Sequence, residues 1–177
     1  MLKKFSITIG AFFLLVLLMG VFISNEYEVK RSISINANPQ QIHPFVEDLN
    51  EWPKWTPWQS ADPSVEIIIG EISKGEGASQ KWKGKSGIGE LKITKSSPDY
   101  GVDYMLDMQA DGLNTFSNIT YQSEGTATEV TWIMKGQFAM PVIGAYIAMA
   151  MDGTAGPMYE QGLKKLKELV ENSDQNP

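Results

Sequence analysis

One stretch near the C-terminus, residues 157–172, has the periodicity of an amphipathic α-helix. Its apolar residues recur at the spacing of a single helical face and are Tyr159, Leu163, Leu166 and Val170. Residues 27–136 consist instead of short runs in which apolar and polar side chains alternate, as in strands that are buried on one face. Because an amphipathic helix has to bury its apolar face, the sequence predicts an α+β domain in which one sheet covers this helix.

The alternating runs indicate about seven strands separated by turn residues. They cover residues 27–37, 65–70, 79–83, 88–95, 100–109, 115–122 and 128–135. The fifth run is ambiguous, because four aspartates recur in it at the spacing of a helical face, namely Asp99, Asp103, Asp107 and Asp111. The residues between these aspartates alternate in polarity, so a strand is the favoured interpretation.

Two further segments are predicted to be helical. Asn38 and Pro39 suit the N-cap and first position of a short helix, which we expect to be distorted at Pro44. Residues 141–151 are apolar almost all round and suit a helical segment packed under the sheet. The glycines and the proline at positions 153–157 leave open whether this segment joins the C-terminal helix.

A tryptophan-rich segment, residues 50–63, lies between the short helix and the second strand. Trp52, Trp55 and Trp58 alternate there with prolines, which prevent a regular helix. The segment is therefore predicted to be an ordered loop or a broken helix pinned by aromatic rings. The rings either close one end of the core or contact a ligand, and both interpretations stay open at this point.

The N-terminus carries an uncharged run, residues 5–23, preceded by Lys3 and Lys4. As a helix this run would be roughly 28 Å long, close to the thickness of a bilayer's hydrocarbon core. The positive charge before it predicts a single-pass anchor in the cell membrane, with the N-terminus in the cytoplasm and the following domain on the outer side. A cleaved signal peptide is the alternative, but small residues do not stand at suitable positions for cleavage.

The rest of the chain is long enough for one domain with a sizeable core. We expect residues 1–24 to form the cytoplasmic N-terminus and anchor, residues 25–172 the folded domain, and residues 173–177 a polar tail. Beyond the two N-terminal lysines the chain has 21 acidic and 13 basic residues (15 less two). This excess of negative charge argues against nucleic-acid binding.

The sequence offers few groups for catalysis or for metal binding. It contains no cysteine and one histidine, His43, so neither a catalytic triad nor a zinc site can be assembled, and we expect His43 to lie on the surface of the short helix. The glycines near positions 75 and 87 lack the third glycine of a dinucleotide-binding motif. No catalytic residue, metal site or cofactor is therefore predicted.

What the sequence does contain is a surplus of bulky apolar side chains on the predicted strands and helix. A curved sheet can enclose more volume than one helix fills, and cavities of that kind bind apolar ligands. The candidate cavity-lining residues are Trp55, Trp58, Trp82, Tyr104, Leu106, Met108, Phe116, Trp132, Met134 and Tyr159. An ordinary packed core is the alternative.

Several separated motifs, taken in their order along residues 27–171, resemble those of the SRPBCC superfamily, which includes the START and Bet v 1 proteins. They are RSISINANPQQIHPFVEDLNEWPKWTPW, GEGASQKWKG with GIGELKI, GTATEVTW and MDGTAGPMYEQGLKKLKEL. Within the superfamily the chain is most similar to the bacterial polyketide cyclase/dehydrase-like branch. The resemblance implies a helix-grip fold, in which a curved antiparallel sheet of seven strands surrounds a long C-terminal helix. It also implies two small helices after the first strand and a deep hydrophobic cavity.

The expected function is a membrane-anchored domain that binds a hydrophobic small molecule or lipid without transforming it. One alternative is a cyclase or dehydratase, which would need an acid/base pair such as Tyr104 with Glu90, although alternation places Glu90 on the outer face, away from Leu91. Another alternative is a protein-interaction module with a filled core, which would expose Trp52 and its neighbouring tryptophans.

Overall fold

The computed structural model describes residues 15, 17–85, 87–108 and 113–173. Its single sheet is antiparallel, with the strand order β1-β7-β6-β5-β4-β3-β2. The strands are β1 (Glu26–Ile35), β2 (Glu66–Ile69), β3 (Ser79–Gly84), β4 (Gly87–Ser97), β5 (Gly101–Met108), β6 (Leu113–Glu124) and β7 (Ala127–Gln137). The predicted α+β class and the seven strands are confirmed. Of the ambiguous aspartates, Asp103 and Asp107 lie on β5, Asp99 lies in the turn before it, and Asp111 lies outside the described residues.

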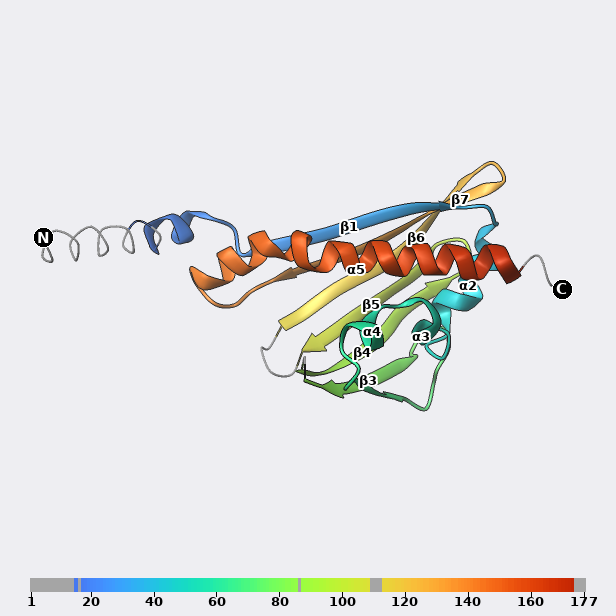
Figure 1. The fold of residues 1–177 in the computed structure, drawn as a ribbon, viewed down its shortest axis with the longest axis horizontal. Helices are drawn as coiled ribbons and strands as arrows, with labels where there is room; N and C mark the ends of the chain where they lie inside the picture. The colour runs from blue at the N-terminus through green and yellow to red at the C-terminus, as the bar shows by residue number, and fades with distance from the viewer. Residues whose placement is uncertain (1–14, 16, 86, 109–112, 174–177) are drawn as a thin grey trace, which may run out of the picture.

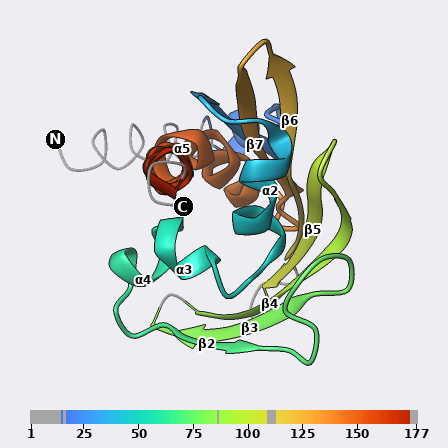
Figure 2. The ribbon, with the colours of Figure 1, turned by 90° about the vertical axis from the view of Figure 1, so that its right-hand side faces the viewer.

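Helix α5 (Ile143–Ser173) lies along the concave face of the sheet, and Figures 1 and 2 show the strands curving around it. The other helices, α2 (Pro39–Glu47), α3 (Trp52–Trp55) and α4 (Trp58–Ala61), all lie between β1 and β2 in the chain. Asn38 caps α2 with a reciprocal pair of hydrogen bonds to Gln41, a capping box. The tryptophan-rich segment thus forms two single helical turns and closes the side of the fold that the sheet leaves open (Figure 2).

The two C-terminal helical segments join into one helix of 31 residues that continues through Pro157. Contacts with β1 hold this part of α5 in place. The Arg31 guanidinium lies against Gly156. It occupies the space that a Cβ atom at position 156 would need. It also bonds Asp152 (2.6 Å) and Glu160 (2.9 Å) on either side of the proline. Tertiary contacts therefore maintain a helix that its local sequence disfavours.

The core lies between the sheet and α5 and is built from alternate residues of each strand. Cross-strand neighbours share a face, so Tyr104 of β5 lies beside Ser117 of β6, which pairs in turn with Met134 of β7. From α5, Tyr159, Leu163, Leu166 and Val170 are all buried against this surface. The face predicted from helical periodicity is the face that the structure buries.

His43 lies in this core, so the prediction of a surface position is wrong. The side chain is 3% exposed. One ring nitrogen is 3.3 Å from the Tyr121 hydroxyl and the other is 3.1 Å from Ser96 Oγ. Both polar atoms of the ring thus have partners, which is what allows a histidine to be buried on the apolar face of α2.

Most of the predicted anchor, residues 5–23, lies outside the described residues, as does all of the predicted polar tail beyond Ser173. Residues 17–22 are helical. Gly20 approaches Val142 and Tyr146, so this helix lies beside the start of α5. Within the described ranges, no helix combines the length and the hydropathy needed to cross a bilayer.

Candidate ligand-binding cavity

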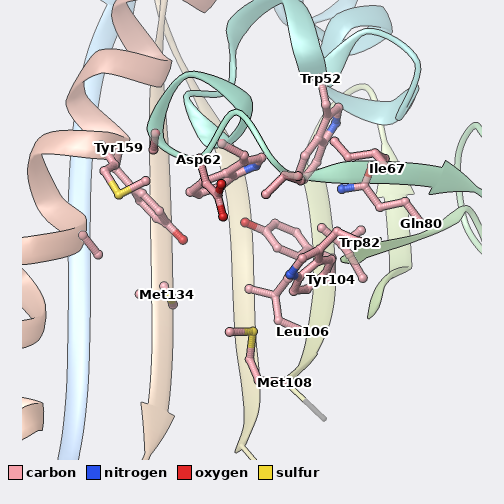
Figure 3. Close-up of a pocket in the computed structure, with 16 residues that line it drawn as sticks. Trp52, Asp62, Ile67, Gln80, Trp82, Tyr104, Leu106, Met108, Met134 and Tyr159 are labelled. Atoms are coloured by element: carbon pink, nitrogen blue, oxygen red, sulfur yellow. The ribbon is translucent and has the colours of Figure 1, made fainter. Parts of the chain in front are cut away.

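A cavity of about 350 Å³ lies between β2–β5, β7, the α3–α4 segment and α5 (Figure 3). This volume is within the range of roughly 300–1,000 Å³ that is typical of small-molecule sites. The lining residues are Trp52, Trp58, Ala61, Asp62, Val65, Ile67, Gln80, Trp82, Leu91, Tyr104, Leu106, Met108, Met134, Ala155, Met158 and Tyr159. Apolar carbon makes up most of this wall, so the cavity suits an apolar molecule.

The cavity has a fully buried floor and a partly exposed rim. Trp52, Leu91, Tyr104 and Tyr159 are each 2% exposed or less and form the floor. The rim consists of partly or fully exposed residues from four elements and the loop after α4, which include Trp58, Ala61, Val65, Trp82, Met108, Ala155 and Met158. The pattern of exposure indicates that the cavity opens between α4, α5 and the strand ends.

The tryptophans of the α3–α4 segment are fixed in place by hydrogen bonds. Trp52 Nε1 donates to the Val46 carbonyl at 2.9 Å, and Trp55 Nε1 donates to the Phe45 carbonyl at 3.0 Å. Both side chains are buried, and Trp58 is partly buried. This segment therefore forms a wall of the cavity and presents no exposed aromatic patch to a partner protein.

An aromatic cluster joins the sheet to α5 beside the cavity. The rings of Trp132 and Tyr159 stack with their centroids 3.9 Å apart and an angle of 19° between their planes. Trp132 Nε1 donates a hydrogen bond to the Tyr104 hydroxyl at 2.6 Å. Gly162 makes room for this arrangement, since a Cβ atom there would lie only 2.9 Å from Trp132.

The two tyrosine hydroxyls of this cluster are un-ionised at neutral pH. Burial raises the pKa of Tyr104 to about 12, and the Trp132 hydrogen bond opposes that rise. Burial also raises the pKa of Tyr159 well above its ordinary value, with a further contribution from Tyr104. Groups of this kind can orient a ligand through hydrogen bonds, but they are poor general bases.

Asp62 is the carboxylate that lines the cavity. It follows α4 directly and accepts hydrogen bonds from the backbone nitrogen (3.0 Å) and the hydroxyl (2.6 Å) of Ser64. Glu90 lies on the outer face, as the alternation of β4 predicts, where its carboxylate is 3.7 Å from Lys81 Nζ. The acid/base pair considered for catalysis, Tyr104 with Glu90, is therefore not assembled.

Seven of the ten predicted residues line the cavity: Trp58, Trp82, Tyr104, Leu106, Met108, Met134 and Tyr159. Trp55 and Trp132 are fully buried behind the wall, where their rings contact each other in an edge arrangement. Phe116 lies on the outer face of the sheet, opposite Lys135 of β7. The next residue, Ser117, is the one that points inward and is buried. Whether the seven residues contact a ligand stays a prediction.

The sequence-based prediction missed several lining residues. Gln80 could have been found, because it stands two positions before Trp82 on β3 and so shares its face. Ile67 pairs with Trp82 across β2 and β3, but it starts a run of three isoleucines in which no alternation shows which side chains point inward. Ala155 required knowledge that α5 extends back through Pro157, whereas Met158 lies in the predicted helix beside Tyr159 but off its apolar face.

Comparison with known families identifies the fold. The family described as polyketide cyclase / dehydrase and lipid transport matches residues 26–171. The chain belongs to this family. Membership agrees with the resemblance to SRPBCC proteins that the sequence motifs indicate. No curated protein sequence matches the chain at a significant level.

Several solved structures resemble this chain in fold. A hypothetical protein from Helicobacter pylori aligns with a TM-score of 0.63 at 9% identity, over 81% of this chain and 87% of that one. XoxI from Bacillus cereus gives 0.59 at 15% identity, over 84% and 98%. Aha1 from Colwellia psychrerythraea, solved as a dimer, gives 0.56 at 18% identity, over 81% and 96%.

Proposed function

We propose that this protein binds an apolar small molecule or lipid in the cavity and holds it without chemical change. The observation that carries the proposal is the apolar cavity of about 350 Å³ between the sheet and α5. A buried floor with a partly exposed rim suits a ligand that enters from one side and is shielded along most of its surface. The family's description, which includes lipid transport, supports the same function.

The chemistry of the wall supports binding rather than catalysis. Tyr104 and Tyr159 keep their protons at neutral pH, as tyrosines ordinarily do, and burial raises their pKa values further. The carboxylate of Asp62 already accepts two hydrogen bonds from Ser64. Acid/base catalysis needs a group that exchanges a proton near the working pH, and these side chains are poorly suited to that task.

We also propose that residues 5–23 anchor the protein in the membrane, with the domain on the outer side. The uncharged N-terminal run and the lysines before it support this topology. Further support comes from the first turns of α5, where Ile143 (62%) and Met149 (66%) are exposed. Figure 1 shows that this end of α5 and residues 17–22 lie at the same end of the molecule. Apolar side chains exposed there would face the membrane surface.

Native mass spectrometry of the full chain, released from detergent micelles, tests the binding function. The matched control is Leu106→Trp, which fills part of the cavity with a bulky indole in place of an isobutyl group. Membrane lipids that adhere to the N-terminal segment will appear with both proteins. A ligand held in the cavity will give an adduct, near one per chain, with the wild type alone.

Solvent extraction of that adduct then identifies the ligand's class. Equal adducts on the wild type and on Leu106→Trp would refute binding in the cavity, provided that the variant keeps the wild-type circular dichroism spectrum.

A further inference from the structure

Gln80 is a polar residue in the apolar wall of the cavity. It lies on β3, is 4% exposed, and pairs across the sheet with Leu91 on one side and Ile69 on the other. Its side chain lines the cavity, and Figure 3 shows the amide directed inward from the strand. A buried amide with two apolar cross-strand neighbours needs a partner from elsewhere.

Within the described part of the chain, no group donates a hydrogen bond to Gln80 Oε1, which is completely buried. An amide taken out of water without partners is destabilising, and most buried polar side chains in native proteins are paired. A half-turn of the amide exchanges its oxygen and nitrogen, so the group can present either a donor or an acceptor to the cavity. A ligand group that pairs with whichever amide atom faces the cavity would reduce this cost.

The charges around the cavity restrict the ligand further. The described lining includes the Asp62 carboxylate and no lysine, arginine or histidine. A carboxylate or phosphate on the ligand would be desolvated there without a cation and near a like charge. A neutral polar group is therefore favoured, and a hydroxyl satisfies either orientation of the Gln80 amide because it both donates and accepts.

We propose that Gln80 is the polar anchor of the cavity and that the natural ligand is a neutral apolar molecule carrying a hydroxyl group. This inference rests on the proposed binding function and specifies the ligand's chemical class. The inference excludes plain hydrocarbons as the natural ligand, because they would leave the amide unpaired. It also excludes fatty-acid anions, because the described lining offers no cation to pair with a carboxylate.

Two neutral probes of nearly the same shape test the inference on the full chain in detergent: 2-naphthol and 2-methylnaphthalene. Their fluorescence reports binding directly, and both are titrated against the wild type and Gln80→Met, a variant of similar length without an amide. Comparing the change in affinity for one probe with that for the other isolates the contribution of the hydrogen bond. Gln122→Met is the control, because Gln122 is exposed on β6 and lies outside the cavity lining.

We expect Gln80→Met to weaken the binding of 2-naphthol about tenfold more than the binding of 2-methylnaphthalene. This is the factor for one buried hydrogen bond. Gln122→Met should change neither affinity. Without probe, Gln80→Met should melt at a higher temperature than the wild type, because it removes an amide whose oxygen is buried without a partner. An amide that had a structural partner would give a lower melting temperature instead.

The outcomes separate this inference from the proposed function. If both probes bind the wild type and Gln80→Met weakens them equally, Gln80 is not the anchor, although the cavity still binds ligands. If ionised 2-naphthoate binds the wild type more tightly than 2-naphthol, the inference of a neutral ligand is overturned. If none of the probes binds, the proposed function fails together with the inference.

Discussion

Replacing Trp132 with phenylalanine should destabilise the protein by about 3 kcal/mol. The indole is completely buried, and its Nε1 donates to the Tyr104 hydroxyl at 2.6 Å, a hydrogen bond worth about 1 kcal/mol net. Weakening of the stack on Tyr159 costs ~0.5–1.5 kcal/mol. The smaller ring leaves an additional void of roughly 40 Å³, which costs about 1 kcal/mol at ~24 cal/mol per Å³.

Urea and thermal unfolding of the wild type and Trp132→Phe measure this loss. For a chain of this size, about 3 kcal/mol corresponds to a fall in melting temperature of roughly 6–12 °C. A double-mutant cycle with Tyr104→Phe isolates the hydrogen bond, because the double variant removes both partners at once. We expect a coupling energy of about 1 kcal/mol between the two substitutions.

Two results would contradict the role assigned to Trp132. A total loss below about 1 kcal/mol would mean that the core closes around the smaller ring, and that the indole is not closely packed. A coupling below ~0.3 kcal/mol, within the usual error of additivity, would mean that the bond between Trp132 and Tyr104 does not contribute to stability.

Three further predictions follow from contacts at other sites. Gly89→Ala puts a methyl group against both the Trp82 indole and the Asp107 carbonyl, so the ring and the strand must shift at the cavity wall. 2-Naphthol binding should then fall at least tenfold in a fluorescence titration, and circular dichroism checks that the protein stays folded. The Arg31 hydrogen bond lowers the pKa of Asp152 below its ordinary 3.8. The stability that this pair contributes is therefore complete above pH 3.8 and is lost as the pH falls through the lower pKa of the folded state. In urea unfolding, Arg31→Met should lack this loss of stability in acid. Burial lowers the pKa of His43 below 6.5, so its contribution to stability is complete above pH 6.5 and declines as the pH falls toward the folded pKa. His43→Gln should flatten this slope below pH 6.5 in thermal unfolding.

The fold could be predicted because its elements have clear periodicities. The face of α5 that carries Tyr159 and Leu166 is apolar at helical spacing, and the strands alternate at a period of two. The continuity of α5 could not be predicted, because Gly153, Gly156 and Pro157, which join its two predicted segments, are all unfavourable in helices. Ion pairs from a strand more than a hundred residues away hold this junction in place, and local sequence carries no information about such contacts.

The errors at the site arise where polarity and burial disagree. On β6 the inward positions 115 and 117 are a threonine and a serine, and the larger Phe116 points outward, so size and hydrophobicity indicate the wrong face. Gln80 and His43 are polar residues on buried faces, and a rule that places polar side chains in water misses both. His43 is buried because it has partners within the chain, and Gln80 is the residue that we expect a ligand to pair.

Strand β1 has consequences for the order in which the chain assembles. Its partner in the sheet is β7, in a register that joins Glu26 to Gln137, and every other neighbouring pair of strands is consecutive in the chain. The meander from β2 to β7 can form by local hairpins, but β1 can pair only after a long loop closes. During synthesis, β1 can therefore neither pair with β7 nor be covered by α5 until the last third of the chain has been made. Since α5 is the last element made, we expect a newly made chain to pass through a stage in which the apolar lining of the cavity is still exposed to solvent.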